Sequence, residues 1–131
     1  MLLDTSGLFC LLNKREPDHD RAVAEYATAT SRRITHSGIL EELVPLCTTR
    51  KSSRELAMAY LLELLEDPRV DVIWIDEPLL RRALALLGAR PDKAYSLCDA
   101  VSFILMKDRH LTDALTTDKH FEQEGFRRLL G

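Results

Sequence analysis

Short apolar runs alternate with longer stretches of helical periodicity along the chain. Four runs indicate strands: Met1–Leu3, Arg32–Thr35, Val70–Ile75 and Ala114–Thr117. The third is the clearest, because Val, Ile and Trp suit a buried, pleated surface. Between the strands, apolar residues spaced for one helical face predict helices that begin near Thr5, Asp20, Ser37, Ser52, Leu79 and Ser96, and residues 120–125 predict a short helical turn.

This alternation of strands and helices predicts an α/β fold. Parallel strands joined through helices need crossover connections, so we expect a three-layer α/β/α sandwich around a central, mostly parallel sheet. The chain has 131 residues, 46% hydrophobic and 30% charged, and no repeat, linker or low-complexity segment interrupts it. We therefore expect one compact domain over residues 1–131.

Four acidic side chains fall where such a sheet binds its ligands, beyond the carboxyl ends of the strands. Asp4 directly follows the first strand and Asp118 the fourth, whereas Glu42 and Asp99 lie near the starts of predicted helices. All four should therefore reach the same edge of the sheet. Clustered carboxylates are the oxygen ligands that Mg²⁺ requires, so the pattern predicts a site for a hard divalent cation.

The position of Asp99 is unusual because its helix is otherwise apolar. In the stretch SLCDAVSFILM, residues 96–106, Asp99 is the only full charge. A carboxylate taken out of water without a partner costs on the order of several kcal/mol, and a bound cation would supply that partner. The alternative is structural: Ser96 and Asp99 match a capping box, in which the acid accepts a hydrogen bond from the backbone N–H of Ser96.

Two other ambiguities concern the remaining acids. Asp4 and Asp118 each follow a strand and precede a helix, so either could be a simple N-cap. In the pair Glu41–Glu42, helical geometry places Glu42 beside the apolar face and Glu41 nearly opposite, toward solvent. We favour Glu42 as the member of the site.

Composition excludes several classes of protein. The net charge of −3 gives no general attraction to nucleic acid, although local arrangement matters more than the sum. Three cysteines without a C-x-x-C pair argue against a disulfide framework and a thiolate zinc site. No segment approaches the ~20 apolar residues of a membrane span, and the first residues lack a signal-peptide pattern, so we expect a cytoplasmic protein without membrane association.

Four segments resemble the acidic motifs of the PIN-domain family: LLDTSGLFCLL, ITHSGILEELVPL, YSLCDAVSFILM and ALTTDKHFEQEGFRRL. Their spacing most resembles that of the ribonuclease toxins of VapBC toxin–antitoxin pairs. The resemblance covers nearly the whole chain. It implies helices around a parallel sheet, metal-dependent cleavage of RNA, a cognate antitoxin as partner, and a homodimer.

Carried over by motif, the family's acidic positions fall on Asp4, Glu42, Asp99 and Asp118. The same motifs place supporting hydroxyl groups at Ser6 and Thr116, where they would hydrogen-bond carboxylates or metal-bound waters. The chain departs from the usual pattern at Cys98, where Thr or Ser is more common.

The predicted reaction is hydrolysis of a phosphodiester bond assisted by Mg²⁺ or Mn²⁺. One ion would be held chiefly by Asp4 and Asp99, and a second near Asp118 or Glu42 could stabilise the leaving oxygen. An alternative is a catalytically inactive PIN-like module that binds RNA or protein. A phosphatase or phosphoacceptor domain is disfavoured, because DTS lacks the second Asp of a two-carboxylate loop.

Three groups of basic residues are candidates for contacts with RNA phosphates, although solvated helix faces carry such residues by default. They are Arg50, Lys51 and Arg54, then Arg81 and Arg82, then Arg90 and Lys93. His36 and His120 lie near the predicted site without a partner pattern, so we treat them as surface or supporting residues and assign them no catalytic role.

Overall fold

The computed structural model describes residues 1–131 and contains five strands and seven helices. The strands are β1 (Leu2–Leu3), β2 (Arg33–His36), β3 (Val70–Ile73), β4 (Asp113–Leu115) and β5 (Arg127–Arg128). The helices are α1 (Thr5–Leu12), α2 (His19–Thr28), α3 (Ser37–Thr49), α4 (Arg54–Glu66), α5 (Glu77–Gly88), α6 (Leu97–Asp108) and α7 (His120–Gln123).

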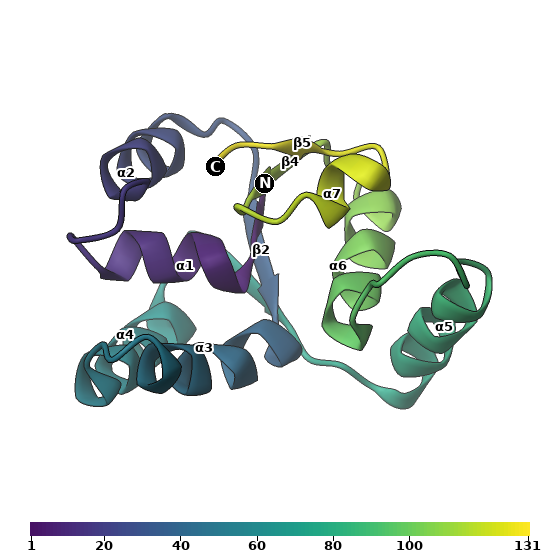
Figure 1. Cartoon of the computed structure of the whole chain (residues 1–131), viewed down its shortest axis with the longest axis horizontal. Helices are drawn as coiled ribbons and strands as arrows, with labels where there is room; N and C mark the ends of the chain where they lie inside the picture. Colours follow the sequence, from purple (N-terminus) through teal and green to yellow (C-terminus); the bar gives the residue numbers. More distant parts are fainter.

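All strand pairs are parallel, and the sheet order is β3-β2-β1-β4-β5. Figure 1 shows the sheet between two groups of helices, with α1 to α4 on one side and α5, α6 and α7 on the other. The predicted α/β sandwich with a mostly parallel sheet is therefore confirmed. β1 lies at the centre, and its residues Leu2 and Leu3 are completely buried.

The chain order creates a crevice between β1 and β4. The connection after β1 leads to β2 on one side, whereas the chain reaches β4 on the other side only after β3 and two helices. Such a reversal leaves an opening at the carboxyl ends of the two strands, where open α/β sheets bind their ligands. Leu3 pairs with Leu115 in register, so the next residues of both strands, Asp4 and Thr116, emerge side by side.

Helix α1 and strand β4 approach each other closely at this edge of the sheet. A Cβ atom added at Gly7 of α1 would lie 2.0 Å from the carbonyl oxygen of Leu115. Only glycine fits there without a shift of the backbone. The helix that follows Asp4 therefore packs directly on the strand that precedes Asp118.

Some predicted boundaries were wrong. The two-residue strand β5 was not predicted, because the sequence Arg127–Arg128 has no apolar signal. β3 ends at Ile73 instead of Ile75, and Trp74 is 64% exposed. None of the helices combines the length and the apolar character that a membrane span requires.

Candidate active site

All four predicted acids line one cleft at the carboxyl edge of the sheet. The cleft has a volume of about 1100 Å³, and its lining residues include Asp4, Glu42, Asp99 and Asp118. They come from four segments of the chain that only the fold brings together. Asp4 follows β1, Glu42 lies on α3, Asp99 on α6, and Asp118 between β4 and α7.

Asp4 is buried, with 7% of its surface exposed, and it is held by hydroxyl groups. Thr116 Oγ1 donates to Asp4 Oδ2 at 2.7 Å, and Ser6 Oγ lies 3.4 Å from the same oxygen. The two hydroxyls are themselves 3.1 Å apart, and Ser6 Oγ accepts from the backbone N–H of Thr117. Both predicted supporting hydroxyls thus contact Asp4, while its Oδ1 takes part in neither contact.

No basic side chain of the protein neutralises Asp4. Burial raises the pKa of Asp4 to about 7, and the hydrogen bond from Thr116 offsets only part of that effect. The nearby charges of Asp99 and Asp118 raise the pKa further. Although Asp4 occupies the N-cap position of α1, its side chain makes no capping hydrogen bond. The simple N-cap interpretation therefore does not explain this residue.

Asp99 is 9% exposed and closes the capping box of α6. Ser96 Oγ accepts from the Asp99 backbone at 3.0 Å, and Asp99 Oδ2 accepts from the Ser96 backbone N–H at 3.0 Å. The structural interpretation is thus correct for Oδ2. It does not use Oδ1, and α6 is buried all around this residue, from Asp99 to Met106. One carboxylate can therefore cap the helix and still present an oxygen to a ligand.

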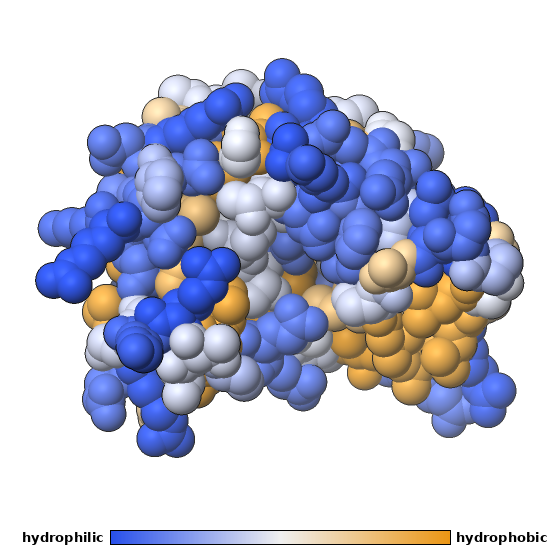
Figure 2. Space-filling view, in the orientation of Figure 1, coloured by the Kyte–Doolittle hydropathy of each residue, from blue (hydrophilic) through white to orange (hydrophobic).

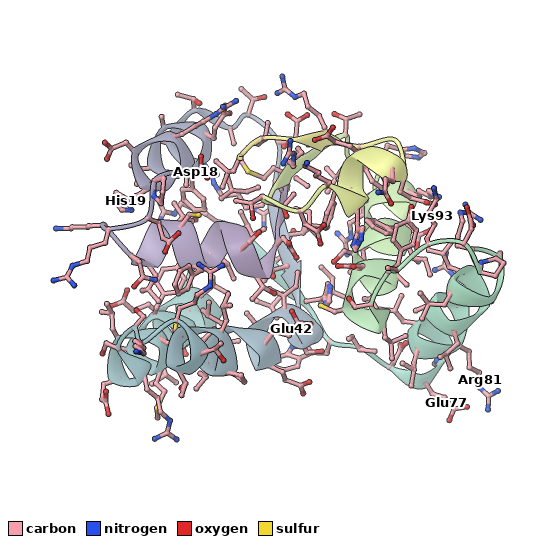
Figure 3. The ribbon with its side chains drawn as sticks, in the orientation of Figure 1. Asp18, His19, Glu42, Glu77, Arg81 and Lys93 are labelled. Atoms are coloured by element: carbon pink, nitrogen blue, oxygen red, sulfur yellow. The ribbon has the colours of Figure 1, made fainter.

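Glu42 lies on α3 at the entrance of the cleft, below the first turn of α1 in Figure 3. Its Oε2 accepts a hydrogen bond from Thr5 Oγ1 at 2.9 Å, which ties α3 to the residue after Asp4. Glu41 and Glu42 are both exposed and both line the cleft, so exposure does not distinguish them. Only Glu42 has a contact with a neighbouring segment of the site.

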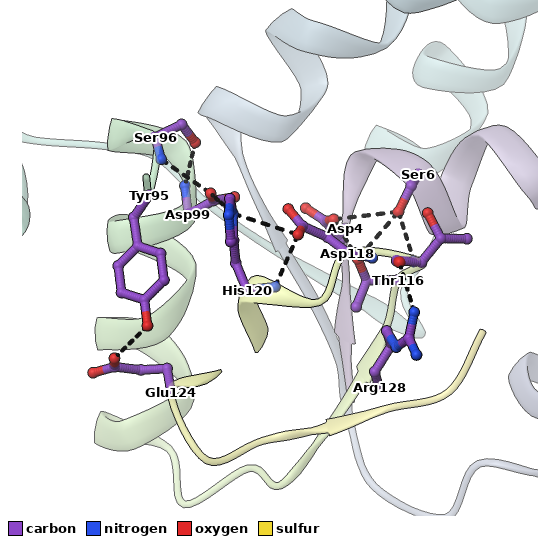
Figure 4. Close-up of polar contacts among 11 residues, drawn as sticks. Asp4, Ser6, Tyr95, Ser96, Asp99, Thr116, Asp118, His120, Glu124 and Arg128 are labelled. Carbon is purple, nitrogen blue, oxygen red and sulfur yellow. Dashed lines mark hydrogen bonds and ion pairs between the residues drawn. The ribbon is translucent and has the colours of Figure 1, made fainter. Parts of the chain in front are cut away.

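Asp118 and His120 form a pair that sequence reasoning missed. Asp118 Oδ1 accepts from the backbone N–H of His120 at 2.9 Å and lies 3.4 Å from His120 Nδ1. The same ring nitrogen lies 3.2 Å from Asp99 Oδ2 (Figure 4). Donor atoms of Asp99, Asp118 and His120 all lie within 4.8 Å of one another, close enough to hold one metal ion. Asp99 is distant in sequence, so no local pattern indicated the role of His120.

Of the two roles expected for His36, at the surface or in support of the site, the structure shows the second. His36 is completely buried at the end of β2, where its Nδ1 accepts from the Gly38 backbone N–H and caps α3. The neighbouring Ser37 does not cap this helix, because its Oγ accepts from the Ile75 backbone N–H. His36 Nε2 lies 2.8 Å from Ser102 Oγ on α6, and burial lowers the pKa of His36 to about 4. His36 is therefore a neutral link between the helices that carry Glu42 and Asp99.

Most of the candidate RNA-binding residues already have acidic partners. Arg81 pairs with Glu77, Arg82 with Asp108, and Arg90 with Glu124. Figure 3 shows Arg81 and Glu77 at the outer end of α5. Lys51 and Arg54 are exposed and make no ion pair, and they follow Thr49, which lines the cleft. The group that begins at Arg50 is thus the best placed of the three.

Comparisons with known proteins agree with this fold. The model of the PIN domain family matches residues 1–126. Among solved structures, the crystal structure of Mycobacterium tuberculosis VapC20, a sarcin–ricin loop cleaving toxin, matches with a TM-score of 0.87. It is 26% identical, and the match covers 99% of this chain and 98% of that one. The comparison with curated proteins found no match. The family resemblance noted in the sequence is confirmed: the chain belongs to the PIN domain family.

Proposed function

We propose that this protein is a metal-dependent endoribonuclease and the toxin of a type II toxin–antitoxin pair. The observation that carries the proposal is the set of four carboxylates in one cleft of a PIN-domain fold. Asp4 is the decisive member, because it is buried beside two other acids without a basic partner. A divalent cation is the partner that such a group lacks.

The donor set fits a hard divalent ion. Asp4, Asp99, Asp118 and Glu42 supply carboxylate oxygens, which suit Mg²⁺ and Mn²⁺. When bound, such an ion activates water for in-line attack on a phosphodiester and stabilises the charge that develops on the phosphate. Asp4 and Asp99 are the residues that we assign to hold it, with Asp118 and Glu42 completing the site.

The remaining groups orient these carboxylates. Thr116 and Ser6 fix Oδ2 of Asp4, so that Oδ1 is the oxygen available to a ligand. Thr5 holds Glu42 from the other side of the cleft. Because these contacts preset the ligand geometry, little reorganisation is needed when a metal and a substrate bind.

RNA is the substrate class that we propose. VapC20 is described as a toxin that cleaves the sarcin–ricin loop, which makes that ribosomal loop the first RNA to test here. The cleft itself is acidic, so phosphates need positive charge at its rim. Lys51 and Arg54 are assigned this task because they are exposed and unpaired. An RNA substrate also agrees with the cytoplasmic location expected from the sequence.

We further propose a cognate antitoxin and a homodimer as the assembly partners. The surface carries apolar side chains that a monomer leaves exposed, with Leu84 of α5 at 52% and Leu62 of α4 at 67%. Figure 2 shows an apolar patch where α5 lies in Figure 1. Patches of this kind mark protein contacts. Two separate helices are available, one for each partner.

The test is cleavage of labelled RNA by the purified protein, freed of any antitoxin. The panel includes a sarcin–ricin loop oligonucleotide, transfer RNA and total RNA, each with Mg²⁺ or Mn²⁺ and with EDTA. We expect discrete fragments that disappear with EDTA and in Asp99→Asn. Fragments that persist in both controls would overturn the assignment. The inactive binding module instead predicts that folded protein retains RNA or protein but binds no divalent ion.

A further inference from the structure

We propose that His120 is a nitrogen ligand of the metal site and makes the cleft prefer Mn²⁺ over Mg²⁺. This inference rests on the proposed function and names a residue that is not one of the four acidic positions carried over from the family. Its starting point is the position of His120 Nδ1 between two carboxylates, 3.2 Å from Asp99 Oδ2 and 3.4 Å from Asp118 Oδ1.

Although Asp99 Oδ2 also accepts from the Ser96 backbone, a carboxylate oxygen has a second lone pair, and these separations are close to those of neighbouring ligands around one ion. In an octahedral site with ligands at about 2.1 Å, adjacent donor atoms lie about 3.0 Å apart. The Nδ1 atom therefore needs to move by only a few tenths of an ångström relative to either oxygen. Figure 4 shows the ring of His120 between Asp99 and Asp118.

The imidazole is also braced from behind by groups that play no part in the acidic cluster. The ring of Tyr95 meets that of His120 edge to face, with centroids 5.3 Å apart at an angle of 67°. Tyr95 is 7% exposed, and its hydroxyl donates to Glu124 Oε2 at 3.0 Å. Glu124 is fixed in turn by Arg90 and Lys107, each 2.9 Å away.

This brace restricts where the imidazole can turn. His120 is partly buried, with 28% of its side chain exposed, so one side of the ring is packed and Nδ1 faces the carboxylates. A histidine that served only as a surface residue would need no such support. Outer groups that orient a ligand are a usual part of metal sites.

The types of ligand atom decide which ion the site binds more tightly. Mg²⁺ takes oxygen ligands almost exclusively, whereas imidazole nitrogen binds more strongly to transition ions. Two carboxylates alone would favour the two ions similarly. The addition of one nitrogen should therefore strengthen Mn²⁺ binding with little effect on Mg²⁺.

The sharpest test is electron spin-echo spectroscopy of Mn²⁺ bound to the purified protein. A directly bound imidazole produces ¹⁴N modulation, and protein labelled with ¹⁵N-histidine should shift its frequency. We expect this modulation in the wild type and its loss in His120→Asn, whose amide keeps a hydrogen-bond donor near Asp99. The matched control is His110→Asn, because His110 is exposed and has a positive φ that Asn tolerates.

Titration calorimetry supplies the second readout. In His120→Asn we expect the Kd for Mn²⁺ to rise about 10-fold and that for Mg²⁺ to change less than about 3-fold. Equal losses for both ions would show that His120 only positions the carboxylates, and would overturn the inference. So would Mn²⁺ binding by the wild type without nitrogen modulation, which leaves the proposed function intact. If the wild type bound neither ion, the proposed function itself would fail.

Discussion

Two buried carboxylates of this protein have opposite surroundings. The side chain of Glu124 is 4% exposed and is met by Arg90, Lys107 and the hydroxyl of Tyr95. Asp4 is comparably buried, but the side chains that bond to it are hydroxyl groups and it lies near other acids. The protein thus provides cations for one carboxylate and none for the other.

The pKa values express this difference. Burial by itself would raise the pKa of Glu124, but the hydrogen bonds from Lys107, Arg90 and Tyr95 outweigh it and lower the pKa. For Asp4, the effect of burial outweighs that of the hydrogen bonds and raises the pKa to about 7. Where a carboxylate has a structural role, as Glu124 has, the fold supplies cationic and hydrogen-bonding partners from the same chain. Where such cationic partners are missing, we propose that a ligand from outside the chain takes their place.

The largest expected effect concerns the carboxylates of the cleft, none of which pairs with a lysine or an arginine. Asp99→Asn keeps the size of the side chain but removes a charged oxygen donor, so RNA cleavage should fall about 1000-fold or more. Gel assays of fragment release measure this. Asp108→Asn is the matched control, because it removes a carboxylate of the same helix that lies outside the cleft and pairs with Arg82, and it should retain most of the activity in folded protein. Equal losses of RNA cleavage in both variants would contradict the distinction between the two kinds of carboxylate.

The second prediction concerns pH and the stability of the metal-free protein. The pKa of Asp4 is about 7 when folded against 3.8 as the ordinary value, so between these pH values the folded state keeps a proton that the unfolded state has released. The free energy of unfolding should therefore fall as pH rises from about 4 to about 7, by on the order of 2–4 kcal/mol.

Urea unfolding in the presence of EDTA at several pH values measures this loss. The free energy of unfolding of the wild type is compared at each pH with that of Asp4→Asn. The variant lacks the titrating group, so it should be more stable than the wild type at pH 8 and similar near pH 4. Addition of Mn²⁺ should restore the stability of the wild type at pH 8 but should not change that of the variant. A difference between the two proteins that does not vary with pH would contradict the assignment.

Glu124 should show the opposite behaviour. Its pKa is lowered in the folded state, so its stabilisation is present above the unfolded pKa and is lost as pH falls through the folded pKa. Glu124→Gln should cost about 1–3 kcal/mol at pH 7, because Arg90 and Lys107 lose a buried partner but remain partly hydrated. Thermal unfolding at pH 7 measures the cost. No change in Tm would show that the pairing is dispensable.

The smallest effects come from single hydroxyl groups. Thr116→Val removes the donor to Asp4 at nearly constant volume and should cost about 1 kcal/mol, with several-fold weaker metal binding. Tyr95→Phe removes one of the three partners of Glu124 but keeps the ring against His120. It should cost no more than about 1 kcal/mol and, because the ring is kept, weaken metal binding less than Thr116→Val does. Calorimetry on both variants distinguishes the two sites.

The sequence allowed the sheet and its acidic edge to be predicted because both follow from local patterns. Asp4 ends an apolar strand, and Asp118 follows another, so parallel geometry alone places them together. The capping box of Asp99 was equally local. These elements required no knowledge of which distant residues meet.

The parts that could not be predicted depend on contacts across the fold. His120 meets Asp99 from 21 positions away, and Glu124 meets Arg90 from 34. His36 is hydrophilic by type, yet Ser102 and Gly38 satisfy its ring inside the core. β5 consists of two arginines and is a strand only because β4 offers free backbone groups beside it.

The central claim is that the carboxylates at the edge of β1 and β4 are completed by a divalent cation. Calorimetric titration of the metal-free wild type with Mn²⁺ at pH 7.5, beside Asp4→Asn and Asp99→Asn, tests this most directly. We expect binding that raises the Tm of the wild type and is lost or greatly weakened in both variants. Absence of binding to folded wild-type protein, or equal binding by all three proteins, would contradict the account.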